Sequence, residues 1–254
     1  MRLIILGCSG VYPGPGKACA GYLVMEGDTR LLLDCGIGVL ANLQKHIAIK
    51  ELTGIIISHM HPDHFFDLVP LRYALLYGRL NVQAKLPVYL PPGGYEIWKS
   101  VVAAFDETKG AFSAPFTLSE YAEQKVYQIG CFKVRLSEIH HYMPNYGVEV
   151  SNTSRLVYSG DAGPGPELVK WAQRADLFLC EATSLKDKTK AENRGHLTAK
   201  EAGAVAREAG VRQLVLTHLM PGVDSEKILS DAKLSFGEKV SLAEEGQTYI
   251  VPEG

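Results

Sequence analysis

The sequence predicts an α/β protein in which two mixed β-sheets are packed between helices. Short β-branched or leucine-rich segments dominate the first half of the chain, and in the second half they alternate with helical patterns. This change of pattern favours two sheets flanked by helices over a purely parallel sheet. A chain of 254 residues is long enough for one substantial core, so we expect a single domain over residues 1–254.

The strands are predicted from short apolar segments between turn residues. In the first half these segments are Leu3–Leu6, Gly21–Met25, Arg30–Leu33, Gly54–Ile57 and Pro87–Leu90. In the second half they are Lys133–Leu136, Arg155–Tyr158, Leu177–Leu179 and Gln213–Leu216.

Three segments are predicted to be helical. The clearest is Ala199–Glu208, because Thr198 and Glu201 have the spacing of a capping box and Gly210 provides a stop. The segment Pro166–Arg174 follows a Gly-Pro-Gly-Pro turn, and a further helix is expected over residues 39–46.

Composition limits the compartment and the partners. The net charge of −2 argues against a generally basic surface that coats nucleic acid, so a large polyanion is not the favoured partner. No apolar segment approaches the ~20 residues of a membrane helix, and the amino terminus lacks the pattern of a signal peptide. The five cysteines form no Cys-x-x-Cys pair and are expected to be reduced thiols. We therefore expect a cytoplasmic protein without a membrane span.

The densest group of chemically active side chains is the segment 59–64, His-Met-His-Pro-Asp-His, directly after the predicted strand Gly54–Ile57. Its four potential ligands cannot all point one way on a strand or helix, whereas a loop, which Pro62 supports, allows it. Imidazoles and carboxylates without a thiolate suit zinc, manganese or iron, and a set larger than four indicates two metal ions. The alternative is a chance polar cluster, which this density disfavours.

Further polar residues follow other predicted strands. Asp161 comes after the segment 156–160, His218 after 213–217, and the neighbours His140 and His141 after 132–139. If these strands end at one rim of the sheets, all of these side chains converge there, where loops carry the chemistry. Taken alone, Asp161 and His218 could each be an ordinary turn residue.

These motifs resemble those of the metallo-β-lactamase superfamily, through the segment 59–64, Ser159-Gly160-Asp161 and Leu216-Thr217-His218. Within the superfamily the chain resembles the ribonuclease Z and cyclic-nucleotide phosphodiesterase branch. The landmarks of that branch that match are Leu6–Gly10, Leu33–Gly36, Cys180–Thr183 and Gly195–Thr198. The resemblance covers nearly the whole chain and implies an αββα four-layer sandwich.

The resemblance implies two divalent metal ions, with zinc favoured and manganese or iron as alternatives. It implies seven ligands: His59, His61 and His141 for one ion, Asp63, His64 and His218 for the other, and Asp161 between them. His141 is chosen because His141-x-x-Pro144-x-Tyr146-Gly147 has the spacing of the third motif of the branch. Strand alternation instead puts His140 on the face of Leu136 unless a bulge near Glu138 changes the phase, so His140 remains an alternative.

The resemblance also implies a mechanism, in which a hydroxide that bridges the two metal ions attacks the phosphodiester. Asp63 would orient the hydroxide, His196 would protonate the leaving oxygen, and Glu181 would orient His196. Asp34 is expected to brace a ligand histidine rather than to bind metal. Taken alone, His196 could be a solvated residue before a helix and Glu181 an isolated surface carboxylate.

The spacing of the motifs bears on the substrate. Ribonuclease Z enzymes grip tRNA with an extra arm, and residues 142–160, which separate His141 from Asp161, leave no room for one. This favours a small phosphodiester such as a cyclic nucleotide over a tRNA. Aromatic and loop residues expected near the pocket are Tyr12–Gly16, Phe65, Phe66, Tyr77 and Met143–Tyr146. The lysine-rich segment 186–190 is interpreted as a solvated loop.

Other functions remain open. A ribonuclease Z-type tRNA 3′-processing endonuclease, a thioester or lactone hydrolase and a non-catalytic metal-binding module could all carry the first motif. The pair of Glu181 and His196 argues against the thioester hydrolase, and the full ligand set argues against the non-catalytic module. By analogy with the resembling enzymes, a homodimer is possible.

Overall fold

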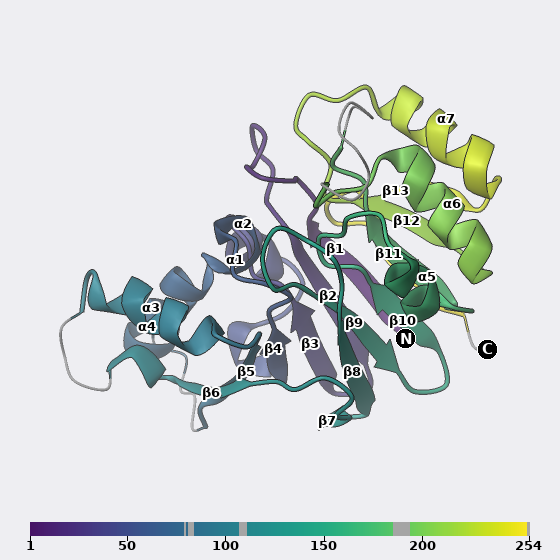
Figure 1. The fold of residues 1–254 in the computed structure, drawn as a ribbon. Coiled ribbons are helices and arrows are strands. Elements are labelled where there is room, and N and C mark those ends of the chain that lie inside the picture. The colour runs from purple at the N-terminus through teal and green to yellow at the C-terminus, as the bar shows by residue number, and fades with distance from the viewer. Residues whose placement is uncertain (79, 81–83, 107–110, 185–193, 253–254) are drawn as a thin grey trace.

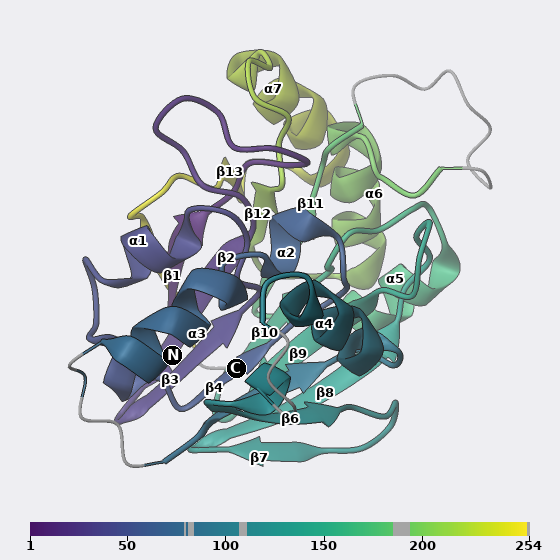
Figure 2. The same cartoon turned by 90° about the vertical axis from the view of Figure 1, so that its left-hand side faces the viewer.

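The structure, a computed structural model, describes residues 1–78, 80, 84–106, 111–184 and 194–252. The lysine-rich segment 186–190 lies outside the described residues. Two seven-stranded sheets pack face to face, with α1 to α4 on the outer side of one and α5 to α7 on the outer side of the other (Figure 1). Figure 2, turned by 90°, shows α3 and α4 in front of the sheets. The predicted four-layer sandwich is confirmed.

The first sheet is mixed and has the strand order β14-β1-β2-β3-β4-β5-β6. Its strands are β1 (Arg2–Gly7), β2 (Gly21–Glu26), β3 (Thr29–Leu33), β4 (Gly54–Ile56), β5 (Leu86–Leu90), β6 (Phe116–Glu120) and β14 (Thr248–Ile250). The neighbours from β14 to β3 are antiparallel, and those from β3 to β6 are parallel.

The second sheet is also mixed and has the order β13-β12-β11-β10-β9-β8-β7. Its strands are β7 (Tyr127–Ile129), β8 (Phe132–Glu138), β9 (Tyr146–Ser151), β10 (Arg155–Tyr158), β11 (Leu177–Glu181), β12 (Leu214–Thr217) and β13 (Val240–Leu242). The four strands β10 to β13 are parallel, so their carboxyl ends lie at one edge of the sheet.

The helices are short and connect the strands. They are α1 (Val39–Leu43), α2 (Pro62–Phe65), α3 (Leu68–Tyr77), α4 (Gly94–Ala103), α5 (Pro166–Ala172), α6 (Ala199–Ala209) and α7 (Ser225–Phe236), with 3₁₀ turns at Ile49–Glu51 and Ala111–Ser113. No helix in the described part of the chain is long and apolar enough to cross a membrane.

The strands are apolar on both faces because each sheet is covered on both sides. In β1, Ile4 and Leu6 belong to the core under the first helical layer, whereas Leu3 and Ile5 belong to the core between the sheets. Successive side chains of a strand point to opposite faces, so a strand buried on both sides needs a continuous apolar sequence. This is why the uninterrupted segment Leu3–Leu6 was readable as a strand.

All predicted strands and helices are present, with small differences at their ends. The predicted capping box is confirmed in α6, where Thr198 Oγ1 accepts from Glu201 N at 3.2 Å and Glu201 Oε2 accepts from Thr198 N at 2.9 Å. The predicted loop over residues 59–64 is wrong in part, because α2 begins at Pro62. Proline suits the first turn of a helix, since its missing N–H has no partner to lose there.

Several elements were not predicted, among them α3, which has the sequence LVPLRYALLY. The side chain of its N-cap residue, Asp67, makes no capping hydrogen bond. Its apolar side chains also surround the helix, so neither a start signal nor a clear apolar stripe marks it in the sequence.

Candidate metal centre

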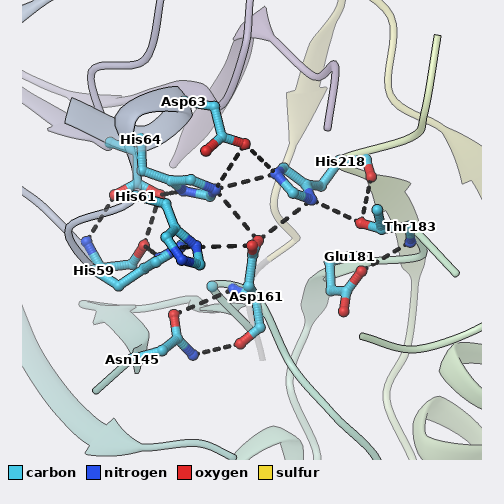
Figure 3. A network of polar contacts seen from close by, with 12 residues as sticks. His59, His61, Asp63, His64, Asn145, Asp161, Glu181, Thr183 and His218 are labelled. Atoms are coloured by element: carbon cyan, nitrogen blue, oxygen red, sulfur yellow. Dashed lines mark hydrogen bonds and ion pairs between the residues drawn. The ribbon is translucent and has the colours of Figure 1, made fainter. Parts of the chain in front are cut away.

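Polar side chains from several strand ends meet at one edge of the two sheets. Asp34 directly follows β3, Asp161 lies just past β10, and His218 directly follows β12. Because β10 and β12 are both parallel to β11, their carboxyl ends lie at the same edge. Figure 3 shows that the labelled histidines and aspartates point toward one another there.

One set of ligand atoms, the half-exposed group, comprises His59, His61, His141 and Asp161. His61 Nδ1 lies 3.0 Å from His59 Nε2 and 3.3 Å from His141 Nε2. Asp161 Oδ2 lies 3.5 Å from His59 Nε2 and 3.8 Å from His141 Nε2. His59 and Asp161 are buried and His61 is partly exposed, whereas the intermediate exposure of residue 141 does not extend to its imidazole, which is 0% exposed.

A second set, the buried group, comprises Asp63, His64 and His218, all of which are buried. His218 Nε2 lies 3.1 Å from both His64 Nε2 and Asp63 Oδ2. The other oxygen of Asp161, Oδ1, lies 3.3 Å from His64 Nε2 and 3.3 Å from His218 Nδ1. Asp161 therefore faces the half-exposed group with one oxygen and the buried group with the other.

The donor set fits divalent metal ions. Within each group the ligand atoms lie within 4.8 Å of one another, and imidazole nitrogens of different histidines face each other. Asp161 Oδ1 is buried and has no hydrogen-bond partner among the described residues. Nitrogen and carboxylate ligands without a thiolate suit zinc, manganese or iron. The cluster can therefore bind metal.

Asp34 supports the buried group from behind. Its Oδ2 accepts hydrogen bonds from His64 Nδ1, Ser58 Oγ and Tyr158 OH, each at 2.8 Å, and its Oδ1 accepts from Ser58 N at 2.7 Å. Since His64 Nδ1 donates in this bond, its other ring nitrogen, Nε2, is directed at the buried group. Asp34 thus braces a histidine and faces no ligand set itself.

His218 is oriented by a hydroxyl group. Thr183 Oγ1 lies 2.7 Å from His218 Nδ1 and 2.7 Å from the His218 carbonyl oxygen. The carbonyl can only accept, so the single hydroxyl hydrogen goes to it and Nδ1–H donates to Oγ1. His218 Nε2, the other ring nitrogen, faces Asp63 and His64.

The backbone around the buried group is strained. Val11, Asp34 and His218 have φ angles of 67°, 57° and 55°, in the left-handed region that non-glycine residues rarely adopt. Val11 N donates to Asp63 Oδ2 at 2.8 Å, which joins the turn after β1 to this group. Such strain persists only where surrounding contacts determine the conformation, and it gathers at functional sites.

The position of Asp161 depends on Asn145. Asn145 Oδ1 accepts a hydrogen bond from Asp161 N at 3.2 Å, and Asn145 Nδ2 donates to the Asp161 carbonyl oxygen. Gly160, immediately before Asp161, has φ 60°, and a Cβ there would lie 2.4 Å from Asn145 Oδ1. Only glycine allows the asparagine side chain to hold Asp161 in this way.

Protonation differs between the two groups. Burial lowers the pKa of His59 and His61 below the ordinary value and lowers that of His141 to about 4, so these imidazoles are neutral at pH 7. Burial also acts on His64, but the carboxylates of Asp161 and Asp34 outweigh it and raise its pKa well above the ordinary value. Neutral imidazole binds metal directly, whereas a protonated one must first release its proton.

The carboxylates stay ionised. Burial opposes ionisation of Asp63, but the hydrogen bond from His218 and the charge of His64 lower its pKa to about 2. Burial also opposes ionisation of Asp161, and the charges of His218, His64 and His59 outweigh it, so its pKa lies well below the ordinary value. Both side chains therefore supply negative charge at any pH near neutrality.

His196 and Glu181 form a pair beside both groups. His196 Nδ1 lies 3.3 Å from Glu181 Oε1 and 4.0 Å from Asp161 Oδ2. Burial lowers the pKa of His196, but the hydrogen bond and charge of Glu181 outweigh it, so the pKa is raised. Glu181 is fully buried and accepts from the backbone N–H groups of Ala162 at 3.1 Å, Leu197 at 2.9 Å and Thr183 at 2.8 Å.

The structure brings the sequence-predicted site residues together, namely His59, His61, Asp63, His64, His141, Asp161, Glu181, His196 and His218. His140 is not among them: its side chain is exposed and its carbonyl accepts from Gly163 N at 2.7 Å. The pairing of β8 with β9 shows no register shift and β8 ends at Glu138, so no bulge in this strand accounts for the choice of His141. Strand alternation does not extend to His140 or His141.

Sequence reasoning missed several supporting groups and misplaced some aromatic residues. Thr183 lies within the landmark Cys180–Thr183, but the sequence does not indicate its contact with His218. Nothing in the sequence marks the hydrogen bond from Val11 N to Asp63. Phe65 is only 2% exposed and belongs to the core under the first helical layer. Tyr77 stacks on Tyr73 within α3, at 5.8 Å between ring centroids.

Comparisons with known proteins identify the family of this chain. Residues 29–219 match the family described as the beta-lactamase superfamily domain. An uncharacterized protein of Mycobacterium tuberculosis is 35% identical over 266 residues, which cover 99% of this chain and 92% of that protein.

Two solved structures are also similar. The metallo-beta-lactamase fold protein YhfI from Bacillus subtilis has a TM-score of 0.86 and 26% identity, and the match covers 98% of each chain. The short form of human tRNase Z has a TM-score of 0.73 and 25% identity, and the match covers 99% of this chain and 100% of that one.

Proposed function

Because the chain belongs to the metallo-β-lactamase superfamily and is a metallo-hydrolase, we propose that it binds two divalent metal ions and hydrolyses a small phosphodiester such as a cyclic nucleotide. In this proposal His59, His61 and His141 hold one ion, while Asp63, His64 and His218 hold the other. Zinc is favoured, and manganese and iron suit the same donors.

One observation carries the two-metal proposal, the position of Asp161. Its Oδ2 faces the half-exposed group and its Oδ1 faces the buried group at 3.3 Å. A carboxylate shared in this way is expected where two cations lie side by side. The burial of Oδ1 without a hydrogen bond among the described residues supports the same interpretation, since a buried carboxylate oxygen needs a partner.

The chemistry divides between the ions and the side chains. When bound, two divalent ions lower the pKa of water toward neutrality and neutralise charge on the phosphate. Asp63, ionised because its pKa is about 2, accepts a hydrogen bond from the attacking water and orients it. His196 donates the proton to the leaving oxygen, and its raised pKa keeps it protonated to higher pH than a free histidine.

Glu181 gives His196 its orientation. Three backbone N–H groups hold the buried carboxylate, which in turn contacts His196 Nδ1 at 3.3 Å. The remaining ring nitrogen, Nε2, is then free to deliver a proton to the leaving group. In this arrangement a fixed carboxylate orients the histidine that acts as general acid.

The compact middle of the chain favours a small substrate. Residues 142–160 contain the whole of β9 and β10, and they leave no segment for an arm that would grip tRNA. A tRNA 3′-processing endonuclease is the second candidate, and the likeness to the short form of human tRNase Z over the whole chain favours it. The pair of Glu181 and His196 argues against a thioester or lactone hydrolase.

Side-by-side hydrolysis assays test the proposal. The purified protein, loaded with zinc or manganese, is given a 3′,5′-cyclic nucleotide, a 3′-extended tRNA precursor and a simple thioester, and its metal content is measured by elemental analysis. Preferred cleavage of the cyclic nucleotide with two ions per chain is expected. Preferred cleavage of the tRNA would establish the second candidate, and cleavage of the thioester alone would reject the phosphodiesterase proposal.

A further inference from the structure

Tyr142 is a large exposed aromatic residue next to the metal centre. Its side chain is 66% exposed, and its ring centroid lies 5.2 Å from that of His141 and 5.8 Å from that of His196. No hydrogen bond of its hydroxyl group is found among the described residues. Exposing a phenol ring to water has an energetic cost, so its position beside two site histidines calls for an explanation.

Gly195 leaves the room that the Tyr142 ring occupies. A Cβ at residue 195 would lie 2.6 Å from both Cδ2 and Cε2 of the tyrosine ring. The Gly195 carbonyl accepts a hydrogen bond from His141 Nδ1 at 2.7 Å, which ties the segment before His196 to the residue preceding Tyr142. The ring therefore packs against the Gly195 backbone, beside the rings of His141 and His196.

The other exposed aromatic residues lack this relation to the site. Tyr77 is 73% exposed but stacks on Tyr73 in α3. Tyr12 is 49% exposed, and no contact of its ring with a site histidine is found in the described part of the chain. Phe66 packs edge-on against Phe65 at 5.2 Å. Among these residues, only Tyr142 has a ring beside both the half-exposed group and His196.

We infer that Tyr142 is a specificity-determining residue, on which the base of a nucleotide substrate stacks. The inference rests on the proposed phosphodiesterase function. His196 is the proposed donor to the leaving oxygen, so the organic group joined to the phosphate lies on its side of the site, where the Tyr142 ring is exposed. Aromatic side chains bind bases through their faces, which every base possesses, so the platform would select for a base without selecting its identity.

A matched pair of substrates tests the platform. Adenosine 3′,5′-cyclic phosphate carries a base, and methyl riboside 3′,5′-cyclic phosphate carries the same cyclic diester without one. Tyr142→Leu should raise KM for the first about tenfold, a typical loss for one stacked base, and leave kcat and the second substrate unchanged. Tyr142→Phe keeps the ring and should behave as the wild type. Tyr77→Leu is the control for loss of an exposed tyrosine.

A binding experiment separates this inference from the proposed function. Calorimetry on the metal-loaded protein compares adenosine 5′-monophosphate with ribose 5-phosphate, with no turnover required. Tyr142→Leu should weaken binding of the first about tenfold and leave the second unchanged. Equal effects of Tyr142→Leu on both ligands, or none on either, would overturn the platform. Failure to hydrolyse either cyclic phosphate, with the binding difference intact, would instead contradict the proposed function alone.

Discussion

The half-exposed and buried groups of the metal centre differ in exposure and in what supports them. In the buried group a carboxylate holds His64, a hydroxyl holds His218 and a strained backbone N–H holds Asp63. In the half-exposed group the partners are neutral: the Gly195 carbonyl contacts His141, and the Ser58 hydroxyl contacts His59. Charged and strained support lies on the side away from solvent, whereas the exposed side meets His196 and Tyr142. We infer that substrate enters on the half-exposed side.

The largest effect is expected from Asp161→Ala, because this side chain belongs to both groups. Turnover should fall to that of the metal-free protein, and metal content should fall in both groups together. Elemental analysis and hydrolysis assays on the same sample measure this. Retained activity with two ions per chain would show that the two groups are independent of Asp161 and would remove the main link between them.

The next effect distinguishes two neighbouring histidines. His141→Ala should weaken metal binding of the half-exposed group by more than about 100-fold, since losing only a supporting partner of a ligand costs about 10- to 100-fold. His140→Ala is the matched control and should leave affinity unchanged, because its side chain is exposed outside the cluster. Calorimetric titration of both variants with metal measures the two affinities and shows which histidine is the ligand. The reverse order of effects would reassign the ligand to His140.

A smaller effect is expected from Asp34→Asn, which keeps the shape of the side chain but removes its charge. Metal affinity of the buried group should fall about 10- to 100-fold, and that of the half-exposed group, which Asp34 reaches only through Ser58 and His59, should fall less. Asp67→Asn is a suitable control, because Asp67 accepts a hydrogen bond from Leu40 N and touches no site histidine among the described contacts. Equal losses in both groups would mean that Asp34 supports the whole centre.

The smallest effect is a difference in proton release at pH 7. His64 is protonated without metal because its pKa is raised, so filling the buried group should release about one proton. His141, with a pKa of about 4, is already neutral, so filling the half-exposed group should release none. The release should disappear as the pH rises above the pKa of His64.

Calorimetry in two buffers with different ionisation enthalpies counts these protons. The variant His141→Ala isolates the buried group, and His218→Ala isolates the half-exposed group. Equal proton release in the two variants would contradict the electrostatic difference between the groups.

Local sequence patterns identified much of the fold. The continuous apolar segment Leu3–Leu6 predicted a strand because both of its faces are buried between layers. The capping box at Thr198 predicted the start of α6 because its partners lie within one helical turn. In contrast, the helical turn at Pro62–Phe65 was missed, since a short helix that begins at proline looks like a loop in sequence.

The sequence by itself determined which residue types are present and which strands they follow, because burial on two faces and capping act over a few neighbouring residues. Tertiary structure decided what local patterns left open, namely that His141, favoured by motif spacing, rather than His140 joins the cluster, and that Asp161 faces both groups. It also decided that Thr183 and Val11 N–H hold their partners. Val11 and Asp63, like Thr183 and His218, are far apart in the chain. Strand order within each sheet brings the members of each pair to the same edge, and the packing of the two sheets then brings the two edges together. No local pattern encodes these distances.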